Sequence, residues 1–421
     1  MRQQNRQPVT RKSVFRRLRD ARLDRLSDKR SRRGRRYPHL ALIHGLMTGC
    51  LAAARSLREV EALTASLNGQ VRKGTQINRR ISDTKLRDTL MQVDVAQARQ
   101  ALVRQVKAEH RRGNLKPDRF PFGVVAIDGK GLGKLDRWDH PDIMRIQHQG
   151  QPPYGLARAH RAHLVSAKAT LCVDQRPIPG DSNEMGNICQ TTQALIETYG
   201  RTDLFEVITV DAGNASVAHA DLIHDHNLGY VFTVKENCGD IYQEALRQLA
   251  QRTSDEAEER QTRREKGARV THRLWRAPIR GFLRWSHARQ LVRIQRVVEE
   301  SNGSFSEGNR YFVTNLPTGR LNASGWLTLV RMHWRCENNG HWSTDVVWKE
   351  DAKRTPWITS PQAVYALAIL RMIALNILAM LRSMSRREWE SKPPPWNQVV
   401  QAVRFTLASS SLVLMERFDF D

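Results

Sequence analysis

The sequence is short of acidic residues relative to basic ones. It has 43 Asp and Glu against 68 Lys and Arg in 421 residues, a formal net charge of +25. Such a chain favours polyanions, because each Lys or Arg placed on a phosphate releases a condensed counterion. We therefore expect nucleic acid as the partner. A ribosomal or membrane-surface protein is the alternative, although most basic proteins of that kind are shorter.

Cysteine is also scarce. The five cysteines stand at positions 50, 172, 189, 238 and 336, and no two have CxxC spacing. This spacing argues against a zinc ribbon and against a redox pair. Hydrophobic neighbours such as Leu51 and Val173 indicate reduced core thiols in a cytosolic protein.

The sequence lacks a secretory signal, because no apolar segment follows the basic N-terminus at the expected distance. Two apolar runs are long or apolar enough to be considered as membrane spans. Leu40 to Ala54 is too short and is interrupted by His44, and Ala363 to Leu381 carries Arg371 and Asn376. We interpret both as buried helices. The expectation is a cytoplasmic bacterial protein without a membrane partner, associated with the nucleoid when on DNA.

Half of the net charge lies at the start of the chain. Residues 1–37 hold fifteen Lys or Arg and three Asp, and the arginines recur at helical spacing among leucines. This pattern predicts either a basic arm or helix on DNA, or a disordered basic tail. Residues 38–118 follow the i, i+3, i+4 rule in several segments, so we predict a helical N-terminal DNA-binding module there.

From residue 120 the pattern becomes that of an α/β domain. Apolar strand-like runs and helices follow in the order strand, strand, strand, helix, strand, helix, strand, which is the order of an RNase H-like core. We predict this catalytic domain over 119–385. Residues 238–310 interrupt it as an inserted, mostly β subdomain, and residues 386–421 form a C-terminal tail. No internal repeat is present.

Two aspartates are placed for metal chemistry. Asp128 and Asp211 each follow an apolar run, Val124–Ile127 and Val207–Val210, and each precedes a small residue. If the two strands are neighbours, the carboxylates converge and can bridge divalent metal, which takes oxygen ligands. A strand ending in Asp-Gly is more often a simple turn, so the pair alone is a weak signal.

A long predicted helix from about Ser324 to Val347 offers the third carboxylate, Glu337. His333, His341 and Thr344 share a helical face with it at i−4, i+4 and i+7. Arg331 and Arg335 flank it as donors that could reach phosphate. A helical Glu is usually a solvated surface group. Its combination with two aspartates and a basic chain favours a catalytic role for Glu337.

These stretches together resemble the DDE transposases of bacterial insertion sequences, in the ISAs-type branch that includes the H-repeat-associated proteins. The resemblance covers roughly residues 35–385. The matching segments are Ile127-Asp128-Gly129-Lys130, His163 to Ala167, Ser182-Asn183-Glu184, Thr209 to Ala212, Val234-Lys235 with Asn237, Tyr311 to Val313, and the run from Arg331 to Arg354 with His333-Trp334, Glu337-Asn338, His341-Trp342 and Asp345.

The resemblance implies that Asp128, Asp211 and Glu337 are the catalytic triad and metal ligands, with Mg²⁺ as cofactor and Mn²⁺ able to substitute. It implies metal-dependent cleavage and strand transfer on double-stranded DNA, namely the element's terminal inverted repeats and a target, by a homodimer in the synaptic complex. We assign Lys130, Lys235, Arg331 and His341 as DNA contacts; ordinary surface charge is the alternative for each. Trp334, Trp342 and Trp348 could stack on bases, although core packing is expected for at least two.

Two other readings of the function stay open. A catalytically impaired DNA-binding relic of a transposase would bind without cutting, and an RNase H-like endonuclease would cut without joining. The glycine-rich run Gly129–Lys134 lacks the spacing of a P-loop, and we predict a flexible loop beside the site. Gly340 is expected to loosen the helix that carries Glu337, because Gly in a helix costs about 1 kcal/mol relative to Ala.

Overall fold

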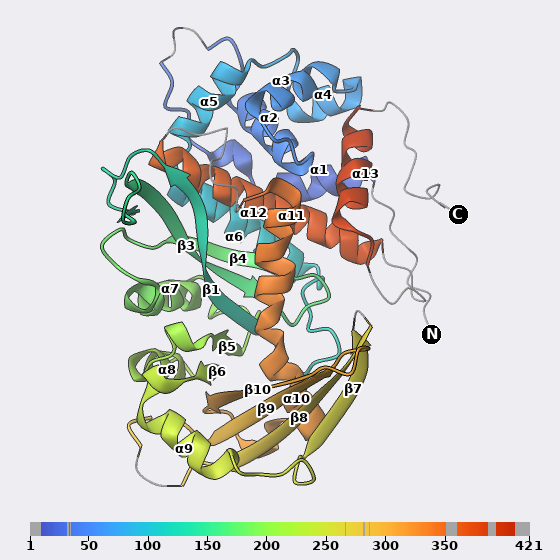
Figure 1. Ribbon diagram of the computed structural model, residues 1–421. Coiled ribbons are helices and arrows are strands. Elements are labelled where there is room, and N and C mark those ends of the chain that lie inside the picture. Colours follow the sequence, from blue (N-terminus) through green and yellow to red (C-terminus); the bar gives the residue numbers. More distant parts are fainter. Residues whose placement is uncertain are drawn as a thin grey trace.

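A computed structural model describes residues 10–408 apart from 32, 34, 266, 281–282, 286, 351–359 and 386–392. Figure 1 shows a helical layer above a long twisted sheet. The α-helices are α1 (Arg11–Asp20), α2 (His39–Leu51), α3 (Leu57–Ser66), α4 (Gly69–Thr75), α5 (Asp83–Gln92), α6 (Val95–Arg111), α7 (Glu184–Tyr199), α8 (Val217–Asp225), α9 (Asp240–Leu249), α10 (Ala323–Met332), α11 (Trp342–Trp348), α12 (Pro361–Met384) and α13 (Trp396–Ala408).

The described strands form one mixed sheet in the order β2-β3-β1-β5-β6-β10-β9-β8-β7, with β4 paired to β3. The strands are β1 (Val124–Leu135), β2 (Ile143–Ile146), β3 (Tyr154–Leu164), β4 (Leu171–Pro177), β5 (Val207–Val210), β6 (Gly229–Val234), β7 (Glu259–Glu265), β8 (Ala268–Pro278), β9 (Gln290–Glu299) and β10 (Phe305–Thr314). The pairs β1–β5 and β5–β6 are parallel, and the others are antiparallel. The prediction of an α/β protein is therefore confirmed.

The central strands are buried on both faces, which explains their unbroken apolar runs. Successive side chains of a strand point to opposite faces. Val125 and Ile127 therefore join the apolar core on the side of α7 and α8, whereas Val124 and Ala126 join the one under α10, where Trp326 is fully buried. The sheet is thereby held between helices at the strands that carry the candidate aspartates (Figure 1).

The segment that the sequence predicted as an inserted β subdomain extends the same sheet. Strands β7 to β10 form an antiparallel ribbon, and β10 pairs with β6 through Tyr311↔Val234 to Thr314↔Val231. The segment also contains α9, which packs on β8, β9 and β10. In Figure 1 this ribbon lies below β6, next to α10.

The helical layer is organised around α12. This helix is long and apolar enough to cross a membrane by composition, yet the protein buries it completely, as the sequence predicted. It contacts α2, α5 and α6 on one side and β4, β1 and β3 on the other. Its buried Asn376 is hydrogen-bonded inside the protein: it accepts from the backbone N–H of Cys172 and donates to Gln105. The helical layer and the sheet therefore share one apolar core.

The basic N-terminal segment is folded where the structure describes it. Helix α1 buries Val14 and Leu18, and it contacts α6 and α12. Arg17 is fully buried and its Nε lies 3.1 Å from Oε1 of Glu109 on α6. Residues 10–26 are therefore packed on the helical layer and do not form a free tail. An arm on DNA stays a prediction, as do the domain boundaries.

Two local predictions were wrong. The apolar residues from His163 to Leu171 predict one strand, but β3 ends at Leu164 and a short segment outside the sheet's named strands connects it to β4. The predicted loop Gly129–Lys134 continues β1, paired with β3 across a register shift between Gly131 and Gly133. Antiparallel pairing of a long hairpin explains the difference, because glycine weakens a strand but marks a bulge without ending the pairing.

Candidate active site

The sheet brings the two aspartates together. Strands β1 and β5 are parallel neighbours with Ala126 opposite Thr209, so Asp128 and Asp211 lie two residues further along the same direction. Asp211 directly follows β5, as predicted. Asp128 lies inside β1, because the strand continues with β3 beyond the point where β5 ends. The two carboxylates nevertheless meet at the place where the parallel pairing stops.

Asp128 is surrounded by acids. Its Oδ2 lies 3.4 Å from Nδ1 of His341 and 3.9 Å from Sγ of Cys336. Burial, and after it the negative charges of Asp211, Glu184 and Glu337, raise the pKa of Asp128 to about 7. Perturbation of this kind by burial and like charges is common at functional sites. Asp128 therefore lies within a cluster of carboxylates.

Glu337 comes from the helical segment that follows α10. It lies in a π-helical turn, η5 (Cys336–His341), and its side chain is exposed. Partial burial raises the pKa of Glu337. The positive charge of Arg310 opposes this rise, and the negative charge of Asp211 adds to it. Glu337 thus faces Asp211 and is the most open carboxylate of the predicted three.

The π turn departs from the regular helical spacing that the sequence predicts around Glu337. His333 and His341 are buried whereas Glu337 is exposed. Nδ1 of His333 lies 2.8 Å from Oγ1 of Thr209, which fixes the helix on β5. A π turn carries more residues than the 3.6 of an α-helix, so it rotates the following residues.

Gly340 is required by the close packing of this turn. A Cβ on Gly340 would lie 2.7 Å from Nε2 of His163 on β3, closer than real Cβ contacts. The ring of His163 is fully buried and meets that of His341 edge to face at 5.6 Å between centroids. Gly340 therefore lets η5 approach the sheet, and the expectation of a merely loosened helix missed this role.

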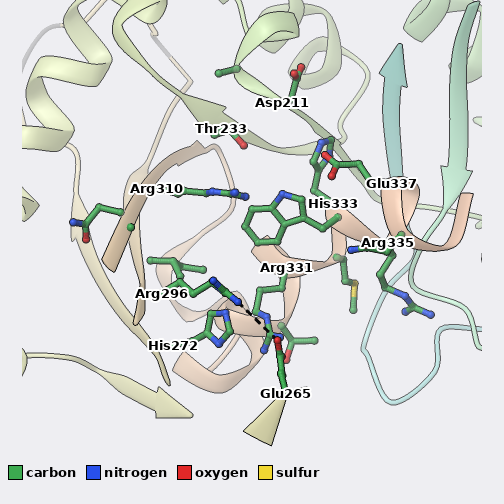
Figure 2. Close-up of a pocket in the computed structure, with 18 of the residues that line it drawn as sticks. Asp211, Thr233, Glu265, His272, Arg296, Arg310, Arg331, His333, Arg335 and Glu337 are labelled. Carbon is green, nitrogen blue, oxygen red and sulfur yellow. Dashed lines mark ion pairs between the residues drawn. The ribbon is translucent and has the colours of Figure 1, made fainter. Parts of the chain in front are cut away.

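A groove of about 960 Å³ opens beside Asp211 and Glu337. Figure 2 shows these two carboxylates at one end, with Arg310, Arg296 and Arg331 further along. The walls come from β7 to β10 on one side and from α10 and η5 on the other. Its lining cations are Lys235, Arg263, Arg296, Arg310, Arg331 and Arg335. A groove lined with cations that ends at carboxylates suits a polyanion with a reacting phosphate.

The predicted DNA contacts divide into two groups. Lys235 and Arg331 line the groove. Lys130 instead lies with its Nζ 3.0 Å from Asp345, and His341 is buried against Asp128. Of the tryptophans, Trp348 is buried and donates to the carbonyl of Cys50, Trp334 lies half-buried under Arg310, and Trp342 is exposed. Core packing thus accounts for Trp348 and part of Trp334.

Two residues of the site were missed at first reading. Arg310 lies immediately before Tyr311-Phe312-Val313, and its guanidinium is 4.2 Å from the ring centre of Trp334 in the groove. Glu184 is the first residue of α7 and influences Asp128 more strongly than Glu337 does. Arg310 stands beside a segment that the sequence analysis singled out and Glu184 stands within one, so these segments were the available signal.

The carboxylates of the site are suitable ligands for a hard divalent cation. Carboxylate oxygens are the ligands that Mg²⁺ and Mn²⁺ prefer, and Asp211, Glu184 and Glu337 all act on Asp128. Among the described residues, no three His, Cys, Asp or Glu side chains meet closely enough to hold an ion as they stand. Asp128, Asp211 and Glu337 are the predicted residues that would supply its oxygen ligands.

A carboxylate centre on neighbouring parallel strands, open to a groove of arginines, is the arrangement expected of α/β proteins that act on phosphodiesters. The transposase DDE domain family matches residues 121–377, and the chain belongs to this family. That span includes all three predicted carboxylates. The resemblance to DDE-type bacterial transposases is thereby confirmed.

Two curated relatives come from Escherichia coli (strain K12). Putative protein YbfL and the H repeat-associated putative transposase YhhI are each 26% identical over 270 residues, which is 61% of this chain. The chain spans 64% of the length of each relative. A solved structure, the piggyBac transposase synaptic complex with hairpin DNA, has a TM-score of 0.44 at 12% identity and covers 88% of this chain and 71% of that one. Likeness at that level carries no argument about the fold.

Proposed function

We propose that this protein is a transposase that cuts DNA at the ends of an insertion sequence and joins the freed strands to a target. The observation that carries the proposal is that Asp211 and Glu337 line one end of a basic groove and that both carboxylates act on the charge of Asp128. The family supports it, since the matched span contains all three residues. On this proposal the α/β core is of the RNase H-like type.

Each carboxylate has a separate task in the proposed reaction. Asp128 and Asp211 come from paired parallel strands, so their carboxylate oxygens would be held by the sheet in position to bind a divalent metal ion. Glu337, on η5, closes the site from the groove side. When bound, Mg²⁺ would supply the Lewis acidity that activates water or a 3′-OH and balances charge on the phosphate.

The groove binds and aligns the DNA strand in this proposal. Arg310, Arg331 and Lys235 provide positive charge beside Asp211 and Glu337, where phosphates flanking the cut would lie. Arginine suits this task because its planar guanidinium binds phosphate oxygens in pairs. The duplexes would be the terminal inverted repeats and a target. Pairing of two ends would take a homodimer, in the bacterial cytoplasm on the nucleoid.

The test is cleavage of a duplex fragment that carries the element's own terminal repeats. Wild type, Asp128→Asn and the matched exposed variant Asp225→Asn on α8 are compared with Mg²⁺, with Mn²⁺ and with EDTA. We expect wild type and Asp225→Asn to release 3′-OH ends in either metal. Asp128→Asn should bind the fragment with unchanged affinity and cut at least a hundredfold more slowly, on the order of a lost catalytic electrostatic group.

Two outcomes would replace the proposal. If wild type binds the ends but cuts with neither metal, the chain is a DNA-binding relic. If it cuts but never joins the cut ends to a supplied target plasmid, it is an endonuclease without strand transfer. The target plasmid is therefore included from the start, and joined products are measured on the same gel as cut ones.

A further inference from the structure

A fourth carboxylate lies against the strand that carries Asp128. Glu184 is the first residue of α7, after the N-cap Asn183. Its carboxylate occupies the space above Gly129: a Cβ there would lie 2.1 Å from Oε1 and 2.4 Å from Oε2 of Glu184. Only glycine leaves room for this approach. The residue after Asp128 is thus fitted to the Glu184 carboxylate.

Asn214 connects Glu184 to the other aspartate. Asn214 is fully buried, its Nδ2 donates to Oδ1 of Asp211 at 2.9 Å, and its side chain also hydrogen-bonds Glu184. The amide oxygen Oδ1 of Asn214 is buried without a hydrogen-bond partner in the described part of the chain. This open acceptor belongs to the amide that bonds both carboxylates, so a donor or a cation that it could bind would lie beside the acidic centre.

The cation nearest to Glu184 is already engaged. Arg158 opposes the rise in the pKa of Glu184 that burial and then Asp211 produce. However, its Nη2 donates to the backbone carbonyls of Ser182 at 2.7 Å and of Pro179 at 3.1 Å. Arg158 therefore holds the turn before α7, and Glu184, the first residue of this helix, has its carboxylate above Gly129 of β1.

We propose that Glu184 belongs to the metal-holding centre, as a fourth carboxylate that binds the divalent cation together with Asp128 and Asp211. This inference rests on the proposed function, because it concerns the same cation. It assigns Glu184 and Glu337 to opposite sides of the centre: Glu184 on the α7 side of the sheet edge and Glu337 on the groove side. Gly129 then serves to admit the Glu184 carboxylate.

The test measures metal binding without DNA. Mn²⁺ is titrated into the full chain by calorimetry for wild type, Glu184→Gln, Asp211→Asn and Glu197→Gln. Glu197 lies on the same helix, is exposed, and undergoes the same change of charge. We expect Glu184→Gln to weaken the tightest Mn²⁺ site by about tenfold or more, as loss of groups around a metal does, with Glu197→Gln unchanged. Equal Mn²⁺ affinity of Glu184→Gln and wild type would overturn the inference.

A second variant keeps the Glu184 carboxylate but moves it away from its place above Gly129. In Gly129→Ala the new methyl group forces the Glu184 carboxylate away, so Mn²⁺ binding should weaken as in Glu184→Gln. The double variant should be no weaker than either single one. If Glu184→Gln fails to fold, by circular dichroism, Gly129→Ala decides alone: an unchanged affinity overturns the inference.

The same titration separates the inference from the proposed function. If wild type binds Mn²⁺, Asp211→Asn loses it and Glu184→Gln does not, the inference fails and the proposed function stands. If wild type binds no Mn²⁺ and cuts no DNA, the proposed function itself fails.

Discussion

Nη1 of Arg161 lies 2.8 Å from Oε2 of Glu350, and neither side chain is exposed to solvent. Arg161 is the β3 residue paired with Asp128 in the sheet, and Glu350 follows the end of α11. Burial acts to raise the pKa of Glu350, but Arg161 and Arg371 together hold it below its ordinary value. The segment that carries Glu337 is thereby tied to the strands that carry the aspartates.

Removing this buried charge should destabilise the protein strongly. Glu350→Gln leaves Arg161 and Arg371 buried without a counter-charge, so we expect a loss of about 3–5 kcal/mol in the free energy of unfolding. Urea titration followed by circular dichroism measures it. The control is Asp139→Asn, whose partner Arg137 is exposed, and which should change stability by about 1 kcal/mol or less. Equal effects of the two substitutions would contradict the assigned role of Glu350.

The acidic centre should make the metal-free protein less stable as the pH rises. The pKa of Asp128 is raised from 3.8 to about 7, so the folded chain holds this proton more tightly than the unfolded chain does. Stability is therefore lost as the pH rises from about 4 to about 7. Asp128→Asn removes the effect, and its thermal midpoint in EDTA at pH 8 should exceed that of wild type by several degrees.

The same measurement has two internal checks. At pH 4 the two proteins should unfold at similar temperatures, because Asp128 is then protonated in the folded state. Added Mg²⁺ should raise the midpoint of wild type at pH 8 and leave Asp128→Asn nearly unchanged, since a ligand stabilises only the state that binds it. Asp225→Asn should behave as wild type. A lower midpoint of Asp128→Asn at pH 8 would show that the carboxylates do not repel each other.

Much of the local structure follows from the sequence. The unbroken apolar run Val124–Ile127 locates the observed start of β1. Asp128 and Asp211 could be paired because both follow buried runs, and parallel strands end on one side of the sheet. Apolar runs are local signals, and these features depend on little else.

The remaining features depend on contacts between distant residues. The π turn at Cys336–His341 arises where Gly340 packs on His163. These two residues are 177 positions apart in the sequence (340 minus 163). The place of Glu184 beside Gly129 depends on the sheet order, and the groove depends on how the β7–β10 ribbon lies next to α10. None of these leaves a periodic signal in the sequence, so spacing alone predicted a regular helix and a flexible loop.

The groove should bind DNA through phosphate contacts that carry no sequence information. Arg331→Ala should weaken binding to any duplex alike and lower the slope of log affinity against log salt by about 1. Fluorescence anisotropy from 50 to 300 mM KCl, on a terminal-repeat duplex and a scrambled one, measures both. The control is Arg201→Ala, because Arg201 is exposed before the start of β5, opposite the end that carries Asp211. An unchanged salt slope in Arg331→Ala would exclude Arg331 from the DNA contact.

The contact between Gly340 and His163 should govern the shape of the helix that carries Glu337. Gly340→Ala places a methyl group 2.7 Å from Nε2 of His163, so the π turn must move away from the sheet. Overpacking of this kind costs about 1–3 kcal/mol. We expect a lower free energy of unfolding, and slower cleavage, because Glu337 shifts relative to Asp128 and Asp211. Gly319→Ala, which would meet nothing within 4 Å, should change neither quantity.

A double-variant cycle isolates this contact from other effects of the alanine. His163→Ala alone removes a buried ring and should destabilise the protein, yet it makes room for the methyl group of Gly340→Ala. The combined variant should therefore lose at least about 1 kcal/mol less than the sum of the two single losses, as expected for residues in direct contact. Additive losses would mean that the ring of His163 does not press on Gly340, and that the π turn has another cause.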